Sequence, residues 1–74
     1  MNVESAQGKK LSPATSNAVI DALGGTAETG RICRCSMAAV SQWRTAGMPA
    51  TRVLFLRERF KNLPVMKLEE VRSF

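Results

Sequence analysis

The sequence predicts an all-α fold, a helix-turn-helix bundle of four short helices. Its 74 residues are enough for one small domain. Residues that favour helix starts precede short segments with apolar side chains at helical spacing, and Gly or Pro separates these segments. Together these observations favour short helices packed around a single core.

The first helix is predicted to begin at Ser12-Pro13, because Ser is a preferred N-cap and Pro suits the first helical position. Gly24-Gly25 is expected to end it. Its apolar residues at helical spacing are Ala14, Ala18, Val19, Ala22 and Leu23.

Two further helices are predicted, "AETGRICR" capped by Thr26 and "MAAVSQWR" capped by Ser36. Gly inside a helix costs about 1 kcal/mol relative to Ala, so Gly30 indicates the close approach of another helix. The expected inward faces are Ala27, Gly30 and Cys33 in the first of these helices, and Val40 and Trp43 in the second.

The fourth helix, "ATRVLFLRERFKN", is predicted to follow Pro49, with a core stripe of Val53, Leu56 and Phe60. The tail after Leu63-Pro64 is open to two interpretations, a short final strand over 65–68 or a turn of helix from Lys67. The expected organisation is a flexible polar arm over residues 1–11, a helix-turn-helix domain over 12–63 and a C-terminal tail over 64–74.

The charge favours a polyanion or an acidic protein surface as the partner. The formal net charge is +5, and only one acid, Glu58, lies between residues 31 and 61. The basic residues of that stretch are Arg31, Arg34, Arg44, Arg52, Arg57, Arg59 and Lys61. A solvated basic surface without a partner is the alternative interpretation.

The composition argues against an enzyme. His and Tyr are absent, and no Ser stands beside a plausible base, so we expect no catalysis, cofactor, metal or small-molecule substrate. Cys33 and Cys35 are too few to close a tetrahedral zinc site, and we expect free structural thiols. Neither a membrane-spanning run nor a signal-peptide pattern is present, which predicts a cytoplasmic protein without a membrane partner.

The stretch "LGGTAETGRICRCSMAAVSQWRTAGMPATRVLFLRER", residues 23–59, resembles the Cro and Cro-like phage and prophage regulators. The shared features are "LGGTA", the small Gly30, the apolar Cys33 and Cys35 about the turn, "AVSQWR", and Gly-Met-Pro-Ala-x-Arg-Val from residue 47. The resemblance implies a helix-turn-helix with residues 26–34 as the supporting helix and residues 36–44 as the recognition helix.

The resemblance also implies which residues would touch DNA. These are Ser36, Met37, Ala38, Ser41 and Gln42 on the recognition helix, with Arg31, Arg34, Arg44 and Arg52 available to phosphates. The sequence departs from the family at Arg34, where Gly is common, and at Met37 and Ala38, which offer no hydrogen bonds to base edges. The helix is therefore either a DNA binder that reads little sequence or a scaffold turned toward a protein.

A second resemblance concerns the whole chain: its size, its basicity, its polar arm and the small-residue start of its recognition helix. In these respects the chain is similar to the small RNA-polymerase regulators of lytic phages, such as that of a Xanthomonas phage. This implies binding to the N-terminal region of the β′ subunit of bacterial RNA polymerase in the host cytoplasm. It also implies inhibition of initiation by displacing sigma, and antitermination.

The fourth helix supplies a candidate protein interface. Arg52, Phe55 and Arg59 share a face away from the core stripe, and an aromatic flanked by two Arg is typical of protein hot spots. The alternative for Phe55 is packing beneath the C-terminal tail. We therefore expect a phage-type regulator of RNA polymerase; the alternative is a Cro-like operator-binding repressor, which would act as a dimer.

Overall fold

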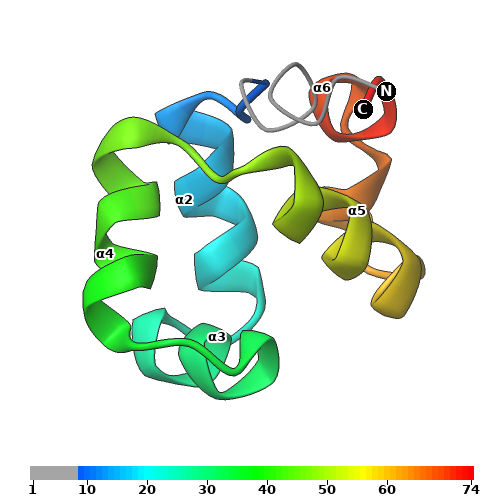
Figure 1. Cartoon of the computed structure of the whole chain (residues 1–74). Coiled ribbons are helices and arrows are strands. Elements are labelled where there is room, and N and C mark those ends of the chain that lie inside the picture. Colours follow the sequence, from blue (N-terminus) through cyan, green and yellow to red (C-terminus); the bar gives the residue numbers. More distant parts are fainter. Residues whose placement is uncertain (1–8) are drawn as a thin grey trace.

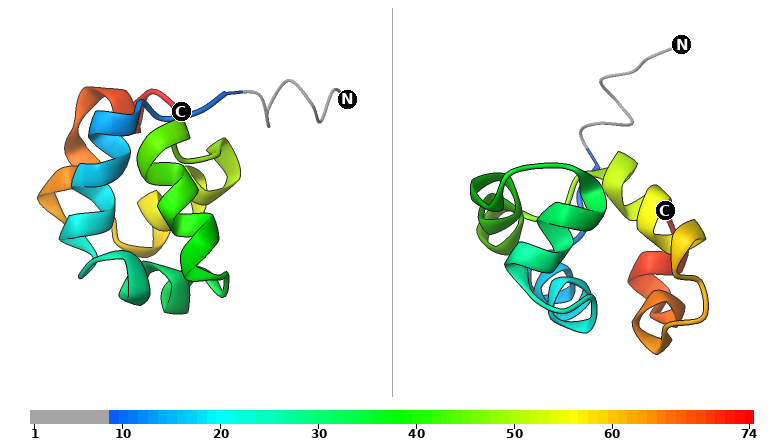
Figure 2. Two further views of the ribbon diagram at one scale, coloured as in Figure 1. Left: turned by 90° about the vertical axis from the view of Figure 1, so that its left-hand side faces the viewer. Right: turned by 90° about the horizontal axis from the view of Figure 1, so that it is seen from below.

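The computed structural model describes residues 9–74, and within this range the protein is all-α, as predicted (Figure 1). Its elements are α2 (Pro13–Ala22), α3 (Thr26–Cys33), α4 (Met37–Ala46), α5 (Ala50–Arg59), the 3-10 helix η1 (Pro64–Lys67) and α6 (Glu69–Arg72). α4 packs against both α2 and α3, and α5 packs against α6 (Figure 2). No helix in the described range is both long enough and apolar enough to cross a membrane.

The predicted helix starts are confirmed at two serines. The Ser12 hydroxyl accepts a hydrogen bond from the Thr15 N–H at the start of α2, and the Ser36 hydroxyl accepts one from the Ala39 N–H at the start of α4. Each cap supplies a partner for an N–H that the helix itself leaves unpaired. Sequence and local hydrogen bonding therefore agree on where these two helices begin.

Gly30 is needed because the turn after α3 and the start of α4 both come close to it, which agrees with the predicted approach of another helix. A Cβ atom on Gly30 would lie 2.9 Å from the main-chain oxygen of Cys35. The Gly30 carbonyl also accepts a hydrogen bond of 2.9 Å from the Cys35 N–H. Any side chain at this position would push the turn away from the end of α3.

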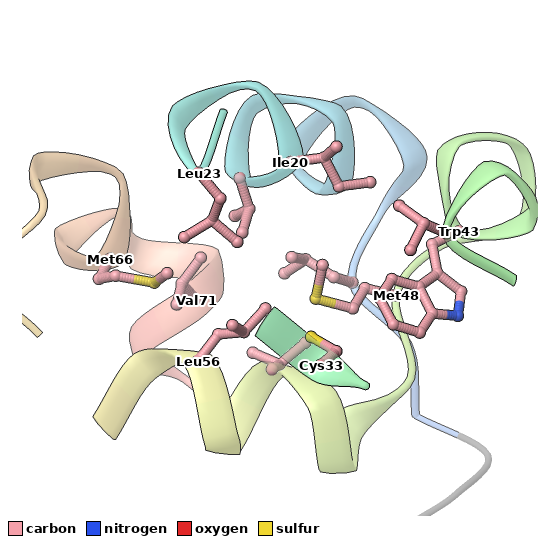
Figure 3. Packing of buried hydrophobic residues seen from close by; sticks show 12 residues of the cluster. Ile20, Leu23, Cys33, Trp43, Met48, Leu56, Met66 and Val71 are labelled. Carbon is pink, nitrogen blue, oxygen red and sulfur yellow. The ribbon is translucent and has the colours of Figure 1, made fainter. Parts of the chain in front are cut away.

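The core is one cluster that draws on every helix of the described range (Figure 3). Trp43 lies beside Met48 at one end of the labelled group, and Met66 and Val71 lie at the other. The fully or almost fully buried apolar members are Leu11, Val19, Ile20, Leu23, Cys33, Val40, Trp43, Met48, Val53, Leu56, Met66 and Val71. Of the stripe predicted on α5, Val53 and Leu56 are buried and Phe60 is half-buried.

The alanines at helical spacing in α2 and the alanine predicted to face inward in α3 are exposed. Ala14, Ala18, Ala22 and Ala27 all lie on the surface. In α2 the larger Val19 and Ile20 side chains turn inward, because burial free energy grows with the apolar area removed from water. In α3 Gly30 and Cys33 are buried as predicted, and Thr29 is buried too, with its hydroxyl 3.5 Å from the Ile20 carbonyl oxygen.

The prediction of a flexible arm was wrong for residues 9–11; the rest of the predicted arm lies outside the described residues. Leu11 is only 1% exposed, and its N–H donates to the Met48 carbonyl at 2.9 Å. Lys10 forms an isolated antiparallel bridge with Pro49, and the Ala50 N–H donates to the Lys9 carbonyl at 3.1 Å. A short extended segment before α2 is therefore paired with the link between α4 and α5.

The C-terminal tail is helical, which resolves its two interpretations. Residues 65–68 belong mostly to η1 and not to a strand, and the last helix begins at Glu69. Met66 and Val71 are buried in the common core, so residues 64–74 pack as part of the same domain.

Glu70 joins this tail to the start of α2. Its carboxylate accepts hydrogen bonds from the Ser12 N–H at 2.6 Å, the Ser12 hydroxyl at 2.9 Å and the Thr15 hydroxyl at 2.6 Å. In a capping box the same main-chain N–H would be bound by a residue three positions further along the helix. Here the acid comes from the other end of the chain.

Ser16→Ala is expected to lower the free energy of unfolding by about 1–3 kcal/mol, the usual cost of leaving a buried polar group without its partner. The Ser16 hydroxyl is fully buried and accepts a hydrogen bond of 2.8 Å from the Met48 N–H. Urea denaturation followed by Trp43 fluorescence measures the effect. The control is Ser41→Ala, which removes an exposed hydroxyl; equal losses in both variants would contradict the role of the buried contact.

Acid is expected to weaken the contact between the two ends of the chain. Hydrogen bonds from Thr15 and Ser12 lower the pKa of Glu70, so its contribution to stability is complete above the unfolded pKa of about 4.3. That contribution disappears as the pH falls through the lower folded pKa. Thermal unfolding between about pH 7 and pH 3 should therefore show a smaller acid-induced loss in Glu70→Gln than in the wild type. The control Glu69→Gln, an exposed neighbour, should keep the wild-type profile.

Candidate functional site

The outer edge of α4 presents few groups that can read DNA bases. Ser36, Met37, Ala38, Ser41 and Gln42 are all exposed, and Met37 is 57% exposed. The Ser36 hydroxyl is already the N-cap acceptor of α4. Gln42 is therefore the one exposed side chain on this edge suited to a bidentate contact with a base.

The inner side of α4 is anchored as predicted. Val40 is fully buried and Trp43 is 7% exposed. The guanidinium of Arg52 lies 6.0 Å from the centre of the Trp43 ring, and its Nη1 is 3.5 Å from the carbonyl oxygen of Cys33. Arg52 thus leans from α5 back onto the helix-turn-helix, where cation–π attraction and packing support it.

The half-buried Arg44 side chain forms hydrogen bonds with other residues of the protein, so it is less available to a phosphate than the sequence suggested. Its guanidinium donates to the Thr26 hydroxyl at 3.0 Å, to the Asn17 side-chain oxygen and to the Asp21 carboxylate at 2.8 Å. The Asn17 amide donates in return to the Arg44 carbonyl at 2.9 Å. These contacts join α2, the start of α3 and α4, so a DNA phosphate would have to compete with them.

Arg31 is also paired, although on the open surface. Its guanidinium forms an ion pair with Glu28 one turn earlier on α3. Hydrogen bonding to Arg31 lowers the pKa of Glu28, and hydrogen bonding to Glu28 raises the pKa of Arg31. The pair reduces the positive charge that this part of α3 offers to a phosphate.

Arg34 takes the left-handed conformation that its position in the turn requires, with φ of 57° and ψ of 46°. Its N–H donates to the Arg31 carbonyl, and the Cys35 N–H donates to the Gly30 carbonyl. This pair of hydrogen bonds is a Schellman motif, which favours glycine at the left-handed position. The Arg34 side chain is exposed, and no residue in 9–74 forms an ion pair with it.

The outer face of α5 exposes a large aromatic side chain. Phe55 is 44% exposed, so it does not pack beneath the C-terminal tail, and the neighbouring Leu54 is exposed to a similar degree. Arg59 is exposed one turn beyond Phe55. Of the three residues predicted on this face, Phe55 and Arg59 are open to a partner, whereas Arg52 is half-buried against Trp43.

A hollow of about 400 Å³ lies between α3 and the end of α5, and the sequence analysis did not predict it. We call it the α3–α5 hollow; its lining residues are Glu28, Arg31, Ile32, Arg34, Arg59 and Phe60. It was missed because its two walls are far apart in the sequence. The available signal was the recurrence of an apolar residue next to Arg in "RICR" and "RF".

The two cysteines are free thiols in different surroundings. Cys33 is buried and Cys35 is half-buried. Burial raises the pKa of the Cys33 thiol, and the adjacent Cys35 adds to this effect, while Arg52 opposes it. A thiol held protonated by its apolar surroundings acts as a small hydrophobic side chain.

Arg44→Gln is expected to lower the free energy of unfolding by about 1–3 kcal/mol, because it removes charge-assisted hydrogen bonds that join three helices. Arg31→Gln, which breaks an ion pair on the open surface, should change stability little. Urea denaturation monitored by Trp43 fluorescence compares the two variants. Equal stability of Arg44→Gln and the wild type would contradict the stabilising role of these hydrogen bonds.

Comparison with known proteins gives no family for this chain. No protein-family model matches the sequence, and neither a curated protein nor a solved structure is significantly similar to it.

Proposed function

We propose that this protein is a phage-type transcription regulator that acts by binding bacterial RNA polymerase. The observation that carries the proposal is Phe55, a large aromatic side chain that is 44% exposed on α5. Exposed aromatic side chains with Arg close by are the usual centres of protein–protein hot spots. Arg59 supplies the exposed charge one turn away.

The helix-turn-helix supports a protein partner more than it supports an operator. The leading edge of α4 begins with Met37 and Ala38, which cannot hydrogen-bond to base edges. Arg44 and Arg31, two of the residues expected to hold phosphates, are engaged with Asp21 and Glu28. The motif therefore offers DNA few free donors.

In this proposal the regulator inhibits initiation by displacing sigma and promotes antitermination, with the N-terminal region of the β′ subunit as its binding site. The resemblance to small phage regulators suggests these steps, and the chain's surface is compatible with them. Displacement requires only that the regulator and sigma exclude one another from the polymerase, so that binding of one lowers the apparent affinity of the other. An enzymatic activity is not needed.

The second candidate function is an operator-binding repressor. It is favoured by the exposure of Ser41 and Gln42 on the outer edge of α4. One such helix contacts too few bases to define a site, so this function requires a dimer that binds two half-sites.

Phe55→Ala should weaken binding to immobilised core RNA polymerase by about 2 kcal/mol or more, the threshold for a hot-spot residue. Leu68→Ala is a matched control, because Leu68 is equally exposed, at 44%, but lies outside α5. Gln42→Ala should also bind as the wild type does.

Selection from a random DNA pool tests the second candidate. Convergence on one short palindrome, with a loss of about 1–3 kcal/mol of discrimination at one base position in Gln42→Ala, would identify an operator-binding repressor and contradict the proposal.

A further inference from the structure

Within residues 9–74, α2 and α3 each end in a Schellman motif, and the two motifs differ at the left-handed position. At the end of α2 the Gly24 N–H donates to the Asp21 carbonyl and the Gly25 N–H donates to the Ile20 carbonyl. Gly24 and Gly25 both have positive φ there, and neither carries a Cβ. At the end of α3 the same hydrogen bonds surround Arg34, the one residue other than glycine with positive φ in the described range.

This conformation costs Arg34 free energy that glycine would not lose. Its side chain makes no compensating hydrogen bond or ion pair with residues 9–74 and instead lines the α3–α5 hollow. Residues with an unfavourable backbone conformation are concentrated at functional sites. The strained backbone of Arg34, together with its charged side chain at the hollow, therefore favours a role in binding a ligand.

The opposite wall supplies a second free guanidinium. Arg59 forms no ion pair with residues 9–74 and lies 5.6 Å from the centre of the Phe60 ring, measured from its guanidinium carbon. The hollow contains three guanidinium groups and one carboxylate, and because Glu28 pairs with Arg31, the two positive charges left over belong to Arg34 and Arg59. A negatively charged ligand group in the hollow would therefore meet a hydrogen-bond donor on each of the two walls.

The rest of the lining is apolar. Ile32 and Phe60 are both half-buried members of the surface that packs against the core. A nucleic-acid backbone would gain nothing from these apolar side chains, because its phosphates bind along a continuous row of basic side chains. A peptide in which an acidic residue stands next to an apolar one matches both parts of the lining.

We propose that the α3–α5 hollow binds an acidic segment of a protein partner, with Arg34 and Arg59 holding a carboxylate and Ile32 and Phe60 contacting the adjacent apolar side chain. The inference rests on the proposed function, because it names the chemistry of the polymerase segment that the regulator would contact. It adds a site whose lining does not include Phe55 and gives Arg34 a role in binding a protein.

A short peptide that alternates aspartate and phenylalanine is the probe. Titration into the isotope-labelled full chain, followed by NMR, should shift the backbone amides of residues 31–34 and 59–60. Arg34→Gly and Arg59→Gln should each weaken peptide binding roughly tenfold, the equivalent of one lost charge-assisted hydrogen bond. Lys67→Gln, which removes an exposed charge on η1, is the matched control and should bind as the wild type does.

Arg34→Gly also separates binding from folding. Its thermal midpoint should be equal to or higher than that of the wild type, since glycine suits the left-handed position. A variant that is at least as stable yet binds the peptide more weakly supports the site. Peptide shifts spread over the whole surface, equal weakening by Lys67→Gln, or tighter binding of a DNA or RNA oligonucleotide at the same amides would overturn it.

The same variants distinguish this inference from the proposed function. If the wild type binds core RNA polymerase and Arg34→Gly binds it equally well, the inference fails and the proposed function stands, because Arg34 lines the hollow and has no part in the Phe55 interface. If the wild type does not bind polymerase but the peptide occupies the hollow, the proposed function fails and the site for an acidic segment stands.

Discussion

The main-chain N–H of Met48 donates to the buried hydroxyl of Ser16, and the placement of the second half of the molecule depends on this contact. The same hydroxyl lies 3.4 Å from the Leu11 carbonyl oxygen, while the Leu11 N–H donates to the Met48 carbonyl. One side chain of α2 thus satisfies polar groups from two other segments in a place that water does not reach. An unpaired main-chain group there would be costly, so the link between α4 and α5 is held in one position.

This link determines which face of α5 is available to a partner. Met48 is fully buried next to Trp43, and α5 starts at Ala50, immediately beyond the paired Pro49 (Figure 3). With Val53 and Leu56 directed into the core, Phe55 is left on the outer face. The exposed aromatic side chain therefore follows from the anchoring of the link and from helical periodicity together.

The arginines divide into two groups according to their surroundings. Arg44 and Arg52 donate hydrogen bonds to other parts of the fold. Arg44 donates to Asn17, Thr26 and Asp21, and Arg52 donates to the Cys33 carbonyl. Arg34 and Arg59 keep theirs at the surface of the α3–α5 hollow. A positive net charge alone does not distinguish these groups, since desolvation and existing partners decide whether a guanidinium can accept a ligand.

The local features of this protein could be predicted from its amino-acid sequence. Ser12, Pro13 and Ser36 indicate where helices start, and helical spacing predicts the burial of Val40 and Trp43. Both predictions succeed because capping and periodicity depend on residues only a few positions apart. The packed fold set the contacts between distant segments: the pairing of Leu11 with Met48, the Glu70 contact with Ser12 and the hydrogen bonds of Arg44 to α2. It also brought Arg34 near Arg59 and turned the small alanines of α2 outward. Polar and charged side chains can satisfy their hydrogen bonds in many local ways, and the choice among them is made by which groups the packed core brings within reach.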